Sequence, residues 1–233
     1  HSGPETAEDS RTHFGIFAPG VTQLFPKGHI INLHPWEHND VAPALAAAFS
    51  TDVPIVALHL TRPAIEVPDR EKLGMASHME ASKGAYLIRD YDDRPRDGVV
   101  IVRGTSSTNT VVSILEDISS KYNVKIVSAI SWELFDRQTS EYKSSIINSQ
   151  EWADSMIITN TGLSVMKNWI ANRVVSDYSL SPDWDNRWRT GGSLEQIIDE
   201  AHLSPRWVME SINRFVTERV ERLERLKKEI PEK

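Results

Sequence analysis

Short apolar runs rich in β-branched residues recur along the chain, and they constrain its fold more than any other feature. The runs are PIVALHL at residues 54–60, GVVIVRG at 98–104, VKIVS at 124–128 and SMIIT at 155–159. Each has the length of a strand, and an unbroken apolar run is typical of a strand covered on both faces. Segments with helical spacing lie between the runs. The sequence therefore predicts an α/β protein with mostly parallel sheets.

The first part of the chain predicts an incomplete α/β unit. HIINLH at residues 29–34 has the pattern of a short strand, and the alanine-rich stretch at 40–49 that of a helix. With the strand at 54–60 they form a strand, helix, strand unit without partners upstream. We therefore expect residues 1–65 to be the end of a larger domain with a partial parallel sheet.

A change of pattern separates this unit from the rest. Residues 66–83 mix charged and small side chains without sustained periodicity, which predicts a linker. From residue 84 onward strands and helices alternate, so we expect a complete, wound, mostly parallel α/β domain over residues 84–233. Helical spacing follows the strand at 98–104, through residues 111–118, and recurs at 163–174.

The end of the chain predicts two helices. Gly191 and Gly192 precede a short helix at residues 194–201, and Ser204 with Pro205 forms an N-cap followed by proline at the first helical position. A long helix is expected from Arg206 to about Glu229. Its apolar stripe consists of Met209, Ile212, Val216, Val220, Leu223 and Ile230.

Composition excludes several classes of protein. The 26 basic and 33 acidic residues give a net charge of −7 without a long basic run, which argues against nucleic acid as a general partner. No apolar run reaches the roughly 18 residues of a membrane span. Without cysteine there is no disulfide and no thiol catalysis, which fits a cytoplasmic protein.

The polar opening, HSGPETAEDSRTH, reads as an irregular loop and begins without methionine. We interpret the chain as a fragment or a processed form. The alternative is that residues 1–4 remain from an expression tag.

Histidine is concentrated near the start, with seven of the eight in the first 78 residues, which favours a site there. Within the opening loop Glu8, Asp9, Thr12 and His13 bring carboxylates close to an imidazole on a backbone free of helical constraints. His59 lies inside an apolar strand and is better read as a core histidine.

Arg62 follows the strand at residues 54–60. Parallel sheets bind ligands at the carboxyl ends of their strands, and a guanidinium binds phosphate in a bidentate manner. This position therefore suggests a phosphate-binding arginine rather than a structural ion pair.

Two segments of the second half carry a resemblance to a known family. VSAISWELFDRQTSEYKSSII at residues 127–147 and KGAY at 83–86 resemble the C-terminal domain of transketolases. The opening loop resembles their pyrimidine-binding domain, with a histidine, Glu-Asp, and Thr-His twelve residues after the first histidine. LTR at residues 60–62 resembles a strand end that carries a phosphate-binding arginine. The loop departs from the family in having Ser10 and Arg11 where Gly-Pro is usual.

The resemblance implies roles for four residues. His1 and Arg62 would bind the phosphate of a sugar phosphate, Asp9 would hydrogen-bond a sugar hydroxyl, and His13 would lie beside the reacting carbonyl as the catalytic residue. Arg11 is expected to pair with Glu8 or Asp9.

The resemblance also implies a reaction and its partners. Transketolases transfer a two-carbon ketol unit from a ketose phosphate to an aldose phosphate in pentose phosphate metabolism. They use thiamine diphosphate with a divalent metal, Mg or Ca, bound mainly by regions outside this sequence. The chain is then expected to supply no metal ligand, to need an upstream part or a separate subunit, to assemble as a homodimer or heterotetramer, and to be inactive alone.

Two other interpretations stay open. The domain order is shared with 2-oxo acid dehydrogenase β-subunits and deoxyxylulose-phosphate synthases. A non-catalytic assembly module is also possible, because a charged helix continues beyond Val216. Trp184, Arg187, Trp188 and Arg189 could stack on a base or sugar, but packing beneath a loop explains them better. GTSSTNT lacks the glycine spacing and lysine of a P-loop.

Overall fold

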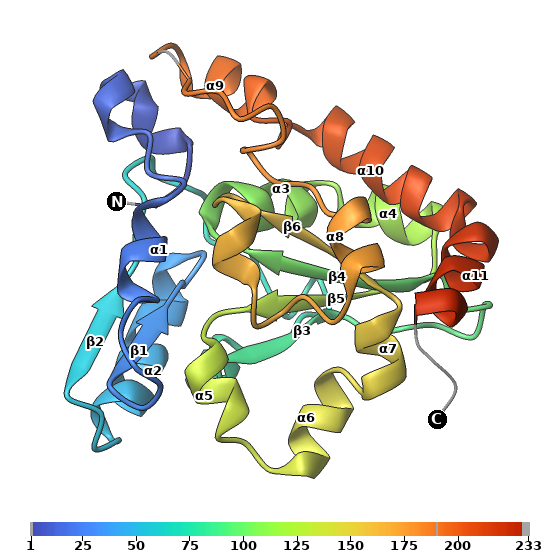
Figure 1. Ribbon diagram of the computed structural model, residues 1–233, viewed down its shortest axis with the longest axis horizontal. Helices are drawn as coiled ribbons and strands as arrows, with labels where there is room; N and C mark the ends of the chain where they lie inside the picture. The colour runs from blue at the N-terminus through green and yellow to red at the C-terminus, as the bar shows by residue number, and fades with distance from the viewer. Residues whose placement is uncertain (1, 190, 230–233) are drawn as a thin grey trace.

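The protein is seen in a computed structural model that describes residues 2–189 and 191–229. Two sheets lie side by side, with the N-terminal unit on one flank of a larger α/β domain (Figure 1). The first sheet has two parallel strands, and the second has four strands in the order β3-β5-β4-β6. The predicted α/β class is therefore confirmed.

The N-terminal unit consists of the predicted strand, helix and strand. β1 (Ile30–Leu33) pairs in parallel with β2 (Ile55–Leu58), and α2 (His38–Phe49) connects them. The short elements η1 (Glu5–Glu8), η2 (Arg11–His13) and α1 (Ala18–Thr22) precede the sheet. β1 is buried, whereas β2 is exposed or half-buried throughout. The expectation that the second strand is covered on both faces is wrong, because none of the four residues of β2 is fully buried.

The larger sheet has a buried centre. β4 (Gly98–Arg103), β5 (Val124–Ala129) and β6 (Ser155–Thr159) run parallel and are buried along their whole length. β3 (Ala85–Arg89) pairs antiparallel with β5 and forms one border of the sheet. Successive side chains of these strands point to opposite faces of the sheet, and each face packs on its own set of helices.

One face of this sheet is continuous with the core of the N-terminal unit. Val100, Val102 and Ile126 pack in the same apolar cluster as Leu33 and Trp36. The helices of this cluster include α3 (Thr105–Ser113), α4 (Leu115–Lys121) and α10 (Pro205–Thr217). A shared core of this kind fixes the N-terminal unit against the larger domain.

The other face is covered by short helices that are rich in aromatic residues. Val99, Ile101 and Ile157 pack against Phe135 and Trp169. The helices on this side are α5 (Trp132–Asp136), α6 (Ser140–Ile146), α7 (Ser149–Ala153), η4 (Leu163–Met166) and α8 (Arg173–Tyr178). The single helix expected at residues 163–174 is thus replaced by η4 and α8.

The predicted linker is packed rather than free. It ends in η3 (His78–Lys83), and the buried guanidinium of Arg70 donates to Glu37 at 2.6 Å and to Asp40 at 2.8 Å. Arg70 also donates to Tyr86 on β3 at 3.0 Å. The boundaries at residues 65 and 83 stay a prediction, but the segment between them is tied to both sides.

The expected long terminal helix is interrupted. α9 (Leu194–Glu200) precedes α10, which begins at Pro205 as predicted, but the helix stops at Thr217 and resumes as α11 (Arg219–Glu229). The interruption lets α11 change direction, and Arg222 of α11 pairs with Asp154 and donates to Phe215 O. Ile230 of the predicted stripe lies outside the described residues. In the same way, the helix expected around residues 111–118 divides into α3 and α4 at Ile114.

Among residues 2–189 and 191–229, none of the helices combines the length and apolar character needed to span a membrane.

Candidate functional site

The opening loop is anchored on the carboxyl ends of β4 and β6. Glu5 is buried, and its carboxylate accepts hydrogen bonds from Asn160 Nδ2 at 2.9 Å, Ser106 Oγ at 2.9 Å and Ser106 N at 3.3 Å. Gly104 precedes this turn at φ 92°, and a Cβ there would overlap Asn160. Burial raises the pKa of Glu5 above its ordinary value.

This anchor occupies the topological switch point of the larger sheet. The chain passes from β4 to β5 on one side and then to β6 on the other, so the crevice lies beyond the ends of β4 and β6. Open α/β sheets bind ligands in such crevices. Here the crevice holds a carboxylate of the chain itself, which positions the loop that continues to Asp9 and His13.

Three of the four predicted site residues lie together. The Arg62 guanidinium forms an ion pair with Asp9, and its Nη1 lies 3.3 Å from Nδ1 of His13. His13 Nδ1 is 3.7 Å from Asp9 Oδ2. His1, the fourth predicted residue, lies outside the described residues. The sequence separates Asp9 from Arg62 by more than fifty positions, and β1, α2 and β2 bring them together.

The charges of this cluster are balanced and remain accessible. The side chains of Asp9, His13 and Arg62 are 41–45% exposed. The Arg62 guanidinium can bind an oxyanion, and the Asp9 carboxylate can accept a hydrogen bond from a hydroxyl. A ligand with both groups could take over parts of the pair that Asp9 and Arg62 now make with each other.

Arg11 behaves differently from the expectation. Among the described residues it takes part in no ion pair, and Arg62 rather than Arg11 pairs with Asp9. The Arg11 carbonyl instead accepts a hydrogen bond of 2.8 Å from Trp188 Nε1.

The tryptophan and arginine cluster of residues 184–189 packs around this loop and a neighbouring turn. Trp188 meets Phe14 edge to face, with ring centroids 5.3 Å apart. Trp184 stacks on His202 at 3.9 Å, and Arg189 is buried and paired with Asp185 at 2.8 Å. The packing interpretation therefore describes these residues better than stacking on a free base or sugar.

A second group lies at the carboxyl ends of β1, β2 and β4, and the sequence analysis named only its His59, as a core histidine. His34 and His59 stack with centroids 4.4 Å apart, and His59 Nε2 lies 3.2 Å from Asn32 Oδ1. Arg103, at the end of β4, is 4% exposed. Burial and, secondarily, the Arg103 charge lower the pKa of His59 to about 4 and lower that of His34 well below its ordinary value.

Glu133 of the SWELF segment makes several hydrogen bonds that connect α5 to the N-terminal unit. Its carboxylate accepts from Asn32 Nδ2 at 3.0 Å, from Asn32 N at 3.3 Å and from Ser131 Oγ at 3.3 Å. The residue thus ties α5 to β1 of the N-terminal unit. The available sign in the sequence was the position of this carboxylate in the helix that follows β5.

In the part of the chain that the structure describes, no three His, Asp or Glu side chains gather as metal ligands would.

Known proteins resemble part of the chain in sequence. Residues 84–177 match the family model described as the transketolase-like TK C-terminal domain. A chloroplastic transketolase of Craterostigma plantagineum is 30% identical over 154 residues, covering 64% of this chain and 28% of that protein. A transketolase of Staphylococcus aureus is 26% identical over 153 residues, covering 64% of this chain and 22% of that protein.

Solved structures extend the likeness in fold to most of the chain. Transketolase from Leishmania mexicana aligns with a TM-score of 0.71 at 18% identity, covering 92% of this chain and 30% of that one. A transketolase of Pichia stipitis in complex with sedoheptulose-7-phosphate aligns with a TM-score of 0.70 at 22% identity, covering 93% and 29%.

The fold and the matched segment define a carboxyl-terminal domain of the transketolase type, preceded by part of a second α/β unit. Residues 84–177 form a transketolase-like C-terminal domain, and the chain is similar in sequence and fold to the carboxyl-terminal part of transketolases. It spans less than a third of the length of the relatives that it matches.

Proposed function

We propose that this chain supplies the substrate-binding residues and the scaffold of a transketolase, which transfers a two-carbon ketol unit from a ketose phosphate to an aldose phosphate. The observation that carries the proposal is the convergence of Asp9, His13 and Arg62. The similarity in fold to transketolases over 92–93% of the chain supports it.

Each residue has a task that suits its chemistry. Arg62 binds the phosphate through charge-assisted hydrogen bonds. Asp9 accepts from a sugar hydroxyl and thereby selects its configuration. His13 lies within reach of both and holds or gives up a proton at the carbonyl oxygen of the substrate. His1 is proposed as a second phosphate ligand. Residues that bind the phosphate orient the reacting end of the substrate, although they do not contact that end.

Thiamine diphosphate with Mg or Ca is the cofactor of the proposed reaction, and when bound it supplies the carbon nucleophile that accepts the ketol unit. Because the described residues do not form a ligand set for the metal, we assign its binding to regions outside this sequence. The residues of this chain act on the substrate only.

The proposal includes a partner that brings the cofactor, either as another part of the same protein or as a separate subunit, and assembly as a homodimer or heterotetramer. Its support is that the chain covers 28% of a full-length relative. Exposed large apolar side chains are also frequent in the N-terminal unit, where a partner can cover them. They are Phe17, Val21, Leu24, Phe25, Phe49, Ile55 and Leu60. A cytoplasmic location is part of the proposal, although several relatives are chloroplastic.

Activity of the reconstituted protein tests the proposal. The chain is combined with the amino-terminal part of a transketolase, thiamine diphosphate and Mg, and consumption of a ketose phosphate with an aldose acceptor is measured. We expect His13→Ala and Arg62→Ala to lower kcat/KM by at least about tenfold, since each loses a charge-assisted contact. Arg206→Ala, at the surface of α10, is the matched control and keeps its activity.

The donor substrate that the reconstituted protein consumes distinguishes the proposed function from its alternatives. Consumption of pyruvate instead of a ketose phosphate identifies an enzyme of the 2-oxo acid dehydrogenase or deoxyxylulose-phosphate synthase type. No activity with either donor, together with normal assembly, identifies a non-catalytic module. Unchanged kinetics in both site variants contradict the site.

A further inference from the structure

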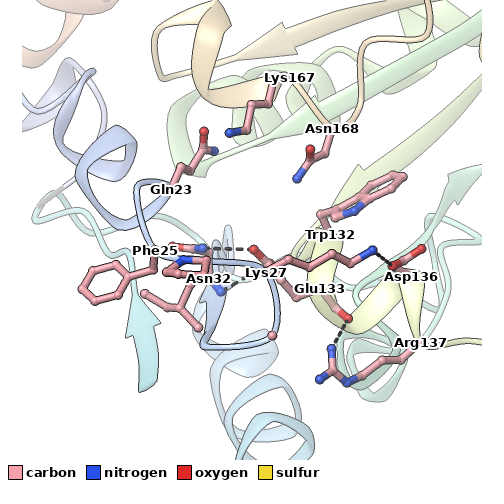
Figure 2. A pocket seen from close by; sticks show the side chains of 13 residues that line it. Gln23, Phe25, Lys27, Asn32, Trp132, Glu133, Asp136, Arg137, Lys167 and Asn168 are labelled. Atoms are coloured by element: carbon pink, nitrogen blue, oxygen red, sulfur yellow. Dashed lines mark hydrogen bonds and ion pairs between the residues drawn. The ribbon is translucent and has the colours of Figure 1, made fainter. Parts of the chain in front are cut away.

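A polar cleft separates the N-terminal unit from the larger domain, away from Asp9, His13 and Arg62. It has a volume of about 360 Å³, which lies in the range of small-molecule sites. It is lined by the segment around residues 23–32, by α5 and by residues 167–168. Figure 2 shows Gln23, Lys167 and Asn168 on one side of the cleft, with Glu133 and Arg137 on the other.

A narrow cavity continues the cleft inward. It shares Gln23, Asn32, Trp132, Glu133 and Asn168 with the cleft and has a volume of about 20 Å³. That is enough for one atom group of the size of an oxygen or a water molecule. Arg103 and His34, both buried, line its inner end.

Arg103 is a buried cation that the fold leaves incompletely paired. It is 4% exposed and donates only to Val165 O at 3.3 Å and Thr161 Oγ1 at 2.8 Å. Its Nε has no hydrogen-bond partner. No carboxylate forms an ion pair with it within the described ranges. A buried cation in this state is costly unless an anion reaches it.

The nearby carboxylate does not satisfy this cation. Glu133 faces the same cavity, but its oxygens accept from Asn32 N, Asn32 Nδ2 and Ser131 Oγ. Its charge therefore supports Arg103 without contacting it.

The rim adds further positive charge. Lys27 pairs with Asp136 at 3.3 Å, whereas Lys167 and Arg137 have no ion pair among the residues that the structure describes. The cleft and cavity together are lined by four cations, Lys27, Arg103, Arg137 and Lys167, against the carboxylates of Glu133 and Asp136. A surplus of cations in a concave site attracts anions. Trp132, Phe25 and Ile30 supply apolar surface beside it.

We propose that this cleft is a second binding site, specific for a small organic anion in which a phosphate or carboxylate group is joined to a planar body. One anionic oxygen enters the inner cavity toward Nε of Arg103, Lys167 neutralises the remaining charge, and the planar body lies against Trp132. The site does not depend on the proposed function, because it shares no residue with the Asp9, His13 and Arg62 cluster.

Calorimetric titration of the intact chain at low salt tests this site without an activity assay. The probes are phenyl phosphate, benzoate, inorganic phosphate and the neutral benzyl alcohol. We expect phenyl phosphate or benzoate to bind and to quench tryptophan fluorescence, with the tighter of the two identifying the preferred anion. Binding of benzyl alcohol or of inorganic phosphate with the same affinity overturns the proposed ligand class.

Three variants assign the contacts. Lys167→Gln, an exposed change, is expected to weaken binding about tenfold, and Arg103→Met to abolish it. Lys121→Gln, an exposed lysine on α4 away from the cleft, is the matched control and binds as the unmodified chain does. If Arg103→Met does not fold, the affinity of Lys167→Gln for the probes still tests the site. The proposal is overturned if the unmodified chain binds no probe at millimolar concentration, or if Lys167→Gln binds like Lys121→Gln.

Discussion

Oε1 of Glu5 accepts a hydrogen bond of 2.9 Å from Nδ2 of Asn160, which lies 155 positions later in the sequence. The same carboxylate accepts from the backbone and the hydroxyl of Ser106 at the start of α3. A single buried side chain thus joins the opening loop to the switch point of the larger sheet. The position of Asp9 and His13 relative to Arg62 depends on this joint, because the loop between Glu5 and His13 contains only short helical turns.

Replacing Glu5 by alanine is expected to destabilise the fold and to loosen the loop. Asn160 and Ser106 would lose a buried acceptor, which costs about 1–3 kcal/mol in the free energy of unfolding. Urea denaturation measures this loss, and amide exchange at residues 8–13 should become faster. Glu8 is exposed, so Glu8→Ala is the control and should change stability by less than about 0.5 kcal/mol. Equal effects of the two variants would contradict the anchoring role.

Removing the Arg70 guanidinium is expected to cost far more than removing an exposed one. Arg70→Met leaves Glu37 and Asp40 buried next to each other without a cation, a loss of about 3–5 kcal/mol. Arg206 pairs with Asp199 at the surface, so Arg206→Met should cost about 0–1 kcal/mol. Chemical denaturation of the two variants measures the difference. Similar midpoints would mean that the predicted linker is not held by this ion pair.

Asp40 makes the stability depend on pH in one direction. Burial, opposed by Arg70 and supported by Glu37, raises the pKa of Asp40 from 3.8 to about 7. The folded state then binds more protons than the unfolded state between these values, so this group makes the free energy of unfolding fall as pH rises from about 4 to 7.

Asp40→Asn should remove that contribution. The free energy of unfolding of both proteins is measured by urea denaturation at pH 4 and pH 7. Relative to the parent protein, the variant should be more stable at pH 7 than it is at pH 4. Asp52→Asn, a change at an exposed residue after α2, is the control. A difference that is independent of pH would contradict the raised pKa.

The sequence was sufficient for the fold class because strands buried on both faces have an unambiguous apolar pattern. β4, β5 and β6 fall where the runs at residues 98–104, 124–128 and 155–159 predict them. The exceptions arise from tertiary contacts. The terminal helix breaks before Arg219, where α11 redirects Arg222 toward Asp154, and apolar spacing alone contains no sign of such an ion pair.

The candidate site could be predicted only as a list of residue types. Asp9, His13 and Arg62 were named from the sequence, and their mutual distances depend on the path of the chain through β1 and α2. Arg103 was not named, because an arginine at the end of an apolar strand usually reaches solvent. Only the packing of residues 161–165 over its side chain shows that it is enclosed.

His59 is expected to give a pH dependence of opposite sign to that of Asp40. Burial and then the charge of Arg103 lower its pKa from 6.5 to about 4, so the unfolded state binds more protons between these values. The stability that this neutral histidine contributes is present above about pH 6.5 and is lost as pH falls through about 4, a change of roughly 3 kcal/mol at most. His59→Gln keeps a polar partner for Asn32 and should lose less stability between pH 7 and pH 4.5 than the parent protein. His29→Gln, an exposed change, should follow the parent protein. Urea denaturation at the two pH values gives the comparison, and parallel losses in all three proteins would show that His59 is not kept neutral by its surroundings.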